Sequence, residues 1–276
     1  MKTWFITGAS SGFGRELATA VLQGGDRAVL AARRPEALAD LVAAHPGKAA
    51  AVALDVTDPA QCADAVAQAF AWAGRLDVLV NNAGYGLLAA LEETDDARLA
   101  RNLETNLTGP LRIIRAAIPR LRAQGGGHII NMSSIAAFAN EMGFSVYGAA
   151  KAGLMAAADA LAGELAPFRI RITTVLPGPF RTDFIGRSLD AAPHRPEYAD
   201  TVGRFEAFLH SINGRQPGDP RRAAQAILAI AGSDAPPAHL VLGRFAHDKF
   251  ASTLDALRQD LAGWEHLGLP TDFPEA

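Results

Sequence analysis

Cysteine is nearly absent from this sequence of 276 residues: Cys62 stands alone, which excludes an intrachain disulfide. A strong charge of one sign is also missing, because 26 Lys and Arg face 29 Asp and Glu for a formal net charge of −3, without the basic excess of a nucleic-acid-binding protein. No apolar run reaches the ~18 residues that a transmembrane helix needs. No charged leader with an apolar signal region precedes the first apolar segment. We therefore expect a cytoplasmic protein that binds neither nucleic acid nor a membrane.

Two common kinds of catalytic signature are missing as well. The seven histidines show neither a His-Glu-x-x-His motif nor another metal-ligand spacing, so no metal site is expected. Ser134 does not lie in the Gly-x-Ser-x-Gly elbow of a serine hydrolase. With 49% apolar and 20% charged residues and no internal repeat or linker, residues 1–276 are predicted to form one domain.

Strand and helix patterns alternate along the chain. The expected strands cover residues 2–7, 27–32, 49–55, 76–80, 127–132, 169–176 and 239–242, and the expected helices cover 13–23, 35–44, 59–73, 97–122, 145–166, 200–211, 220–232 and 244–265. Such alternation indicates right-handed βαβ units. The sequence therefore predicts an α/β fold of the doubly wound Rossmann type, a seven-stranded parallel sheet with helices on both faces. Ligands of such sheets bind beyond the carboxyl ends of the strands.

A glycine-rich turn follows the first expected strand. Residues Thr7 to Gly14 read Thr-Gly-Ala-Ser-Ser-Gly-Phe-Gly and end in an expected helix. Glycine permits unusual backbone angles and a close approach of the main chain to a phosphate, and a helix N-terminus offers unpaired N–H groups to an anion. The turn is a candidate phosphate-binding site, although its glycine spacing differs from the general dinucleotide fingerprint.

Tyr147 and Lys151 lie four residues apart on an expected helix, and Ser134 follows the apolar run 128–132. Side chains at i and i+4 share a helix face, so the phenol and the ammonium can address one reacting group. A phenol has a reference pKa of ~10, and reaching ~7 requires ~4 kcal/mol of differential stabilisation, which a nearby cation can supply. The pattern indicates a site for proton transfer.

Together these motifs resemble the short-chain dehydrogenases/reductases. The resemblance covers roughly residues 2–182, and its motifs occur in the order of the family: Thr7-Gly-x-x-x-Gly-x-Gly14, Asp55-Val56, Asn81-Asn-Ala-Gly84, Asn106, Ser134, Tyr147-x-x-x-Lys151, and Pro177-Gly178 with Thr182. It implies hydride transfer between a nicotinamide and a carbonyl carbon.

The resemblance also assigns the catalytic roles. Tyr147 would exchange the proton on the substrate oxygen, and Lys151 would lower the tyrosine pKa and bind the nicotinamide ribose. Ser134 would hydrogen-bond the substrate oxygen, with Ser133 as the alternative. Asn106 would anchor a water chain to Lys151, or else be a buried amide that satisfies a kinked helix.

For the cofactor, the resemblance implies a set of contacts along the whole motif series. The expected cofactor-binding residues are Gly8, Ser10, Ser11, Gly12, Phe13, Gly14, Arg33, Arg34, Asp55, Val56, Asn82, Ala83, Gly84, Tyr147, Lys151, Pro177, Gly178 and Thr182. NAD-specific members carry a carboxylate at the end of the second strand, where this chain has Ala32 followed by Arg33 and Arg34. Arginine holds a 2′-phosphate well, so NADP is favoured over NAD.

The expected substrate surroundings are mostly apolar. They comprise Tyr85, Leu87, Leu88, Ile135, Phe138, Met142, Phe144, Phe180, Phe184 and Ile185, with Asn140 and Glu141 as exceptions, and residues 181–220 occupy the place of the family's substrate-covering segment. We expect a hydrophobic ketone or aldehyde, or the matching alcohol. An NAD-dependent secondary-alcohol dehydrogenase and a non-catalytic NADP-binding sensor or scaffold are the alternatives. A homodimer or homotetramer is expected, paired through the helices 97–122 and 145–166.

Overall fold

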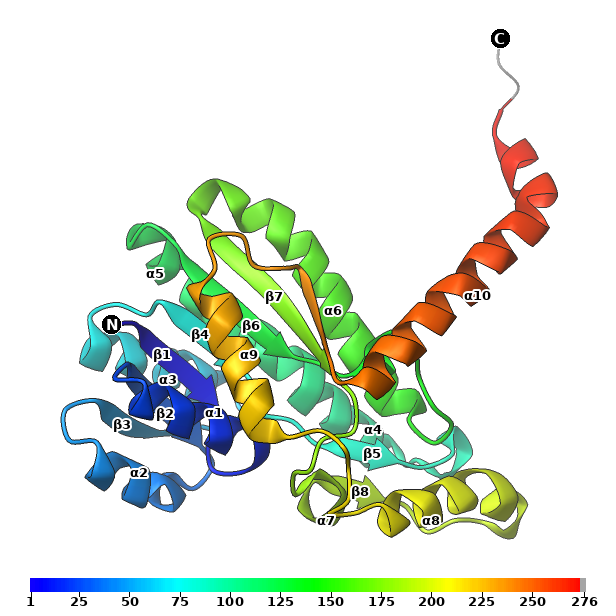
Figure 1. Cartoon of the computed structure of the whole chain (residues 1–276), viewed down its shortest axis with the longest axis horizontal. Coiled ribbons are helices and arrows are strands. Elements are labelled where there is room, and N and C mark those ends of the chain that lie inside the picture. The colour runs from blue at the N-terminus through cyan, green and yellow to red at the C-terminus, as the bar shows by residue number, and fades with distance from the viewer. Residues whose placement is uncertain (274–276) are drawn as a thin grey trace.

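A seven-stranded parallel sheet organises the protein (Figure 1). The computed structural model describes residues 1–273. The strands lie in the order β3-β2-β1-β4-β6-β7-β9. Their bounds are Thr3–Thr7 for β1, Arg27–Ala32 for β2, Ala49–Ala53 for β3, Val78–Asn81 for β4, Gly127–Met132 for β6, Ile170–Pro177 for β7 and His239–Leu242 for β9. The strand order reverses direction between β1 and β4, which confirms the predicted doubly wound fold.

Helices cover both faces of this sheet. On one face lie α1 (Gly12–Gln23), α2 (Ala39–Ala44) and α9 (Pro220–Gly232), whose apolar residues form one core cluster with alternate strand residues. On the other face lie α3 (Pro59–Ala73), α5 (Gly109–Ala123) and α6 (Ser145–Leu165), which form the second. Strands β1, β4 and β6 are buried almost throughout because both of their faces are covered.

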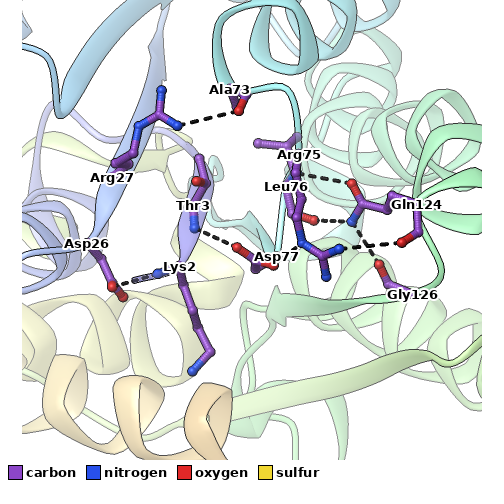
Figure 2. Close-up of polar contacts among 10 residues, drawn as sticks. All are labelled: Lys2, Thr3, Asp26, Arg27, Ala73, Arg75, Leu76, Asp77, Gln124 and Gly126. Carbon is purple, nitrogen blue, oxygen red and sulfur yellow. Dashed lines mark hydrogen bonds and ion pairs between the residues drawn. The ribbon is translucent and has the colours of Figure 1, made fainter.

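Polar contacts join the amino ends of the strands (Figure 2). Asp77 accepts from the backbone N–H of Thr3 at 2.8 Å and from Arg75 Nε at 2.6 Å. Gln124 donates through Nε2 to the carbonyls of Leu76 and Gly126 at 2.5 and 2.8 Å. These contacts satisfy backbone N–H and C=O groups that have no partner within the sheet. The side chains at this edge therefore stabilise the fold, and the carboxyl edge is the one left for ligands.

Several elements differ from the sequence prediction. The expected helix 97–122 is α4 (Asp96–Leu103), a π-helical turn at Glu104–Thr108, and α5. The expected helix 35–44 begins as a 3₁₀ turn before α2. A second parallel sheet of β5 (Gly86–Leu88) and β8 (Leu189–Ala191) was not predicted. Its strands are three residues each, too short for a periodic pattern.

The segment 181–220 contains two helices, α7 (Phe184–Arg187) and α8 (Arg204–Ser211). Sequence predicted a helix over 200–211, and its first part is a π-helical turn at Ala199–Gly203. The final helix, α10 (Arg244–Gly268), is longer than the predicted 244–265 and projects away from the sheet (Figure 1). Within residues 1–273, no helix is long and apolar enough to cross a membrane. The predicted domain 1–276 includes three residues beyond those described.

Candidate active site

A cleft of about 1020 Å³ lies along the carboxyl edge of the sheet. Its walls come from the glycine-rich turn, from the ends of β2, β4, β6 and β7, from α6, and from the covering segment 181–220. Topology therefore brings motifs from distant parts of the sequence to one place, as expected at a switch in strand order.

Tyr147, Lys151 and Ser134 all line this cleft. Tyr147 and Lys151 lie in the first two turns of α6 and are 7% and 4% exposed. The Lys151 ammonium donates to the carbonyl of Met132 at 2.9 Å and lies 5.8 Å from the centre of the Tyr147 ring. The helix and the end of β6 thus hold the lysine beside the phenol without a direct hydrogen bond between them.

The two serines after β6 have different partners. Ser133 is buried and donates through Oγ to the carbonyl of Lys151 at 3.1 Å, so its hydroxyl joins β6 to α6. Ser134 Oγ accepts from the backbone N–H of Ala136 at 3.1 Å and keeps its own proton for another acceptor. This geometry favours Ser134 over the alternative Ser133 as a substrate contact.

Asn106 lies in the π-helical turn and is fully buried. Its Nδ2 donates to the carbonyl of Tyr85 at 2.9 Å, and its Oδ1 accepts from the N–H of the same residue at 3.3 Å. A Cβ on Gly84 would lie 2.6 Å from Asn106 Oδ1 and 3.3 Å from Lys151 Nζ. Glycine at position 84 therefore lets the amide and the ammonium approach the same point. Wide π turns of this kind are frequent at functional sites.

Burial controls the ionisation of the two central groups. It raises the pKa of Tyr147 to about 12, and a hydrogen bond with the Ser134 side chain lowers that pKa by a smaller amount. Burial also lowers the pKa of Lys151 to about 8. The lowering of the tyrosine pKa by Lys151 stays a prediction.

The glycine-rich turn is fastened to the loop after β4. Gly8 and Gly12 have φ angles of +65° and +53°, and a Cβ on Gly8 would lie 2.8 Å from the Cα of Ala83. Asn82 donates through Nδ2 to the carbonyls of Thr7 and Gly8 at 2.9 and 3.1 Å. The first turn of α1 receives no side-chain cap from Ser11, so its N–H groups are available to an anion. The turn fits a dinucleotide pyrophosphate.

Most of the predicted cofactor residues line the cleft. They are Gly8, Ser10, Ser11, Gly12, Phe13, Arg33, Asp55, Val56, Asn82, Ala83, Gly84, Tyr147, Lys151, Pro177, Gly178 and Thr182. Three predicted site residues are not on its wall. Gly14 faces Asn82, where a Cβ would come within 2.4 Å of the amide nitrogen, Asn106 lies behind Gly84, and Arg34 precedes the turn into α2.

The end of β2 offers a cation and no carboxylate. Ala32 and Arg33 line the cleft, and Arg33 is exposed. Within residues 1–273, the guanidinium of Arg33 forms no ion pair. The neighbouring Arg15 is instead paired with Asp40. Arg33 is therefore free to bind an anionic ligand.

Aromatic rings line the part of the cleft between Tyr147 and α8. Tyr147 lies 5.5 Å from Phe144 and 6.0 Å from Phe184 between ring centres, and Phe144 lies 5.6 Å from Phe205. Phe208 continues the series 6.4 Å from Phe205 and is 53% exposed. An apolar path thus runs from the tyrosine to the protein surface.

Part of the predicted substrate lining was wrong. Seven of those residues line the cleft: Tyr85, Ile135, Glu141, Phe144, Phe180, Phe184 and Ile185. Five do not. Leu87 and Leu88 are buried in the core, Phe138 stacks on Phe250, Met142 is exposed, and Asn140 donates to the carbonyl of Phe144. Adjacency in sequence placed these residues near the site, but none of them reaches the cleft wall, and Leu88 packs in the same apolar cluster as Phe144 and Tyr147.

Sequence reasoning missed the contributions of α8 and α10. Phe205, Phe208, Leu209 and Ile212 line the cleft, as do Gln216, Phe245 and Lys249. The first four repeat at helical spacing, so the sequence already indicates that one face of this helix is apolar. Gln216 is 2% exposed, and its side-chain amide has no hydrogen-bond partner within the described part of the chain. Nothing in the sequence distinguishes it from a surface glutamine.

A histidine holds the covering segment in place. His194 Nδ1 lies 2.9 Å from Glu93 Oε2, and its Nε2 lies 2.8 Å from Glu206 Oε2 in α8. Burial alone would lower the pKa of His194, but the two carboxylates outweigh it and the pKa is raised. Only the imidazolium can donate at both nitrogens. We call Glu93, His194 and Glu206 the His194 clasp.

Comparison with known proteins identifies the family of the chain. A sequence model for the short chain dehydrogenase family matches residues 2–192. The chain is 37% identical over 270 residues to Oxidoreductase BOA17 of Botryotinia fuckeliana, covering 97% of this chain and 98% of that protein. It is 32% identical over 250 residues to 3-ketodihydrosphingosine reductase of Bacteroides thetaiotaomicron, covering 90% of each.

Solved structures show the same relationship. A short-chain dehydrogenase from Streptomyces avermitilis has a TM-score of 0.92 at 41% identity and covers 99% of this chain and 100% of its own. A Burkholderia cenocepacia short chain dehydrogenase with NADP has a TM-score of 0.73 at 28% identity, covering 95% and 98%. A 3-ketoacyl-(acyl-carrier-protein) reductase from Brucella melitensis with NADH has 0.72 at 25%, covering 87% and 96%. The chain therefore belongs to the short-chain dehydrogenase/reductase family of NAD(P)-dependent oxidoreductases.

Proposed function

We propose that the protein uses NADP(H) to interconvert a hydrophobic ketone or aldehyde and its alcohol, with Tyr147 as the proton donor to the carbonyl oxygen. The observation that carries the proposal is the convergence of Tyr147, Ser134 and Lys151 in one cleft beside the glycine-rich turn. A bound nicotinamide would supply the hydride.

The protonation state of Tyr147 supports the reductive direction. A pKa of about 12 keeps the phenol protonated at neutral pH, which is the form that can give a proton to a developing alkoxide. Ser134 Oγ can donate a second hydrogen bond to the same oxygen. Lys151, with a pKa of about 8, remains largely cationic at neutral pH and favours the phenolate left after transfer. Oxidation of an alcohol needs the opposite state of Tyr147 and is expected to gain from alkaline pH.

The charge at the end of β2 supports NADP(H). An acidic side chain at position 32 would repel a 2′-phosphate, and this chain has Ala32 there. Arg33 lies on the cleft wall with an unpaired guanidinium among the described residues, which suits bidentate binding of a phosphate.

The aromatic lining supports a hydrophobic substrate. The series from Tyr147 through Phe144 and Phe205 to Phe208 gives an apolar group a surface to pack on. Of the cations on the same cleft wall, Lys249 is paired with Glu141 and Arg187 with Asp183. The name of one relative, 3-ketodihydrosphingosine reductase, supports a ketone as the reacting group.

A panel of ketones and aldehydes assayed with NADPH tests the proposal. We expect oxidation of NADPH that increases with the apolar surface of the substrate, and slower turnover of polar or charged carbonyl compounds. Tight binding of NADPH without turnover of any compound would contradict the proposal, because it indicates a sensor or scaffold. Turnover of secondary alcohols with NAD⁺ alone would contradict the cofactor and the direction.

The cytoplasmic setting and the oligomer paired through helices 97–122 and 145–166 stay predictions. Light scattering of the purified protein tests the oligomer.

A further inference from the structure

An ion pair lies on the cleft wall apart from the residues that the proposed reaction uses. Glu141 and Lys249 both line the cleft, and the carboxylate accepts a hydrogen bond from the ammonium. Glu141 belongs to the loop between Ser134 and Tyr147, whereas Lys249 lies in the second turn of α10. Their side chains are 37% and 24% exposed, so the pair is partly withdrawn from water and a ligand in the cleft can still reach it.

Local packing places the pair close to the tyrosine. The backbone N–H of Phe144 donates to the carbonyl of Glu141 at 3.2 Å, so these two residues share one turn. The ring of Phe144 lies 5.5 Å from that of Tyr147. On the other side of the pair, Phe250 of α10 stacks on Phe138 of the same loop at 4.1 Å. The pair therefore belongs to the part of the cleft that Tyr147 faces.

The pair shares this wall with apolar side chains. The Lys249 ammonium lies 5.9 Å from the centre of the Phe245 ring. Other residues of the loop and of α10 that line the cleft are Ile135, Ala136, Ala139, Phe144 and Phe245. A hydrogen bond is stronger in apolar surroundings than in water, and an unpaired polar group there is costly. The pair can therefore select a ligand that brings a matching polar group.

Both partners keep bonding capacity for such a group. Among the residues that the structure describes, Lys249 Nζ donates only to Glu141 Oε1, which leaves two N–H donors and the carboxylate atom Oε2. A hydroxyl group accepts from the ammonium and donates to the carboxylate, so it satisfies both. A carboxylate on the ligand would meet Glu141, and an ammonium would meet Lys249, so either charge faces a like charge.

We propose that Glu141 and Lys249 form a subsite for a hydroxyl group of the substrate, remote from the reacting carbonyl. The substrate class is then a hydrophobic ketone or aldehyde that carries a hydroxyl group. This inference rests on the proposed function, because it assigns a further contact to the same substrate. A few placed polar groups in a mostly apolar pocket fix the orientation of a ligand, and here the hydroxyl contact would direct the carbonyl to Tyr147.

Two series of ketones assayed with NADPH test the subsite. The first contains unbranched methyl ketones from hexanone to dodecanone, and the second contains the same ketones with a hydroxyl group on the terminal carbon. We expect the hydroxyl group to raise kcat/KM by ~10-fold or more at the chain length that spans the distance from Tyr147 to the pair. Turnover of the plain ketones with no gain at any length would overturn the inference and leave the proposed function intact. Absence of turnover in both series would contradict the two together.

A double variant assigns the gain to the pair. Glu141→Leu with Lys249→Met removes both charges at once, so neither is left unpaired. The ratio of kcat/KM between hydroxylated and plain ketones should fall to about one in this variant. The matched control, Asp183→Leu with Arg187→Met, removes another ion pair of the cleft wall, with side chains 61% and 66% exposed, and should keep the ratio. An unchanged ratio in the first variant, or its loss in both, would overturn the proposal. A lower Tm with the ratio retained would show that the pair only fastens α10 to the loop, and would overturn it as well.

Discussion

Gly84→Ala places one methyl group against Asn106 and Lys151. The new Cβ would lie 2.6 Å from Oδ1 of the fully buried Asn106 and 3.3 Å from Nζ of Lys151. Neither neighbour can move freely, because the Asn106 amide is bonded to Tyr85 and the ammonium to Met132. Overpacking of this kind costs about 1–3 kcal/mol, which corresponds to a fall of roughly 2–12 °C in Tm for a chain of this size.

The same methyl group should reduce catalysis. A shift of Lys151 or of the loop after β4 moves the groups that address the substrate oxygen, and misplacement by about 1 Å can lower the rate by ~10²-fold. Differential scanning fluorimetry without cofactor measures the first effect, and kcat for NADPH-dependent reduction measures the second.

Gly163→Ala is the matched control for this variant. It lies in α6, the helix of Tyr147 and Lys151, and a Cβ there would meet no atom within 4 Å. Alanine is favoured over glycine in a helix by up to about 1 kcal/mol, so this variant should keep or raise Tm and retain full activity. Wild-type Tm and kcat in Gly84→Ala would refute the view that the close approach of Asn106 and Lys151 to residue 84 requires glycine there.

The remaining predictions concern the cofactor and the covering segment. Replacement of Arg33 by Ala should weaken NADPH binding ~10- to 150-fold through loss of a charge-assisted hydrogen bond and leave NADH binding nearly unchanged, and Ala32→Asp should shift the preference to NADH; calorimetry that shows equal losses for both cofactors would reject the role of Arg33. Because the folded-state pKa of His194 is raised, the His194 clasp contributes fully below the unfolded pKa of ~6.5 and is lost as the pH rises through the folded-state pKa. His194→Gln should therefore lower Tm more at about pH 6 than at about pH 9; an equal loss at both would show that the charge of His194 is not involved.

Much of the framework could be predicted because it depends on local patterns. The strands that form the sheet are apolar runs between turn signals. The glycine spacing of Thr7–Gly14, between a strand and a helix, is one that few other structures require. Once strand order places the carboxyl ends together, the motifs that follow each strand must share one cleft. Ser134, Tyr147 and Lys151 were predicted and do line it.

The parts that sequence did not predict depend on contacts between distant segments. Phe208 belongs to the cleft because α8 folds back over it, and β5 pairs with β8 across a hundred residues. The pKa of Tyr147 depends on how deeply the ring is buried, which the i,i+4 spacing to Lys151 does not encode. The π turn at Asn106 interrupts a helix whose apolar spacing appeared continuous.

The steady-state and binding behaviour of Tyr147→Phe tests the central claim most directly. Phenylalanine keeps the ring packing against Phe144 and Phe184 and removes the proton donor. We expect kcat for carbonyl reduction with NADPH to fall by a factor of ~10²–10⁴, as for loss of a positioned general acid, while the Kd for NADPH stays essentially unchanged. Turnover by Tyr147→Phe at the wild-type rate would contradict the account.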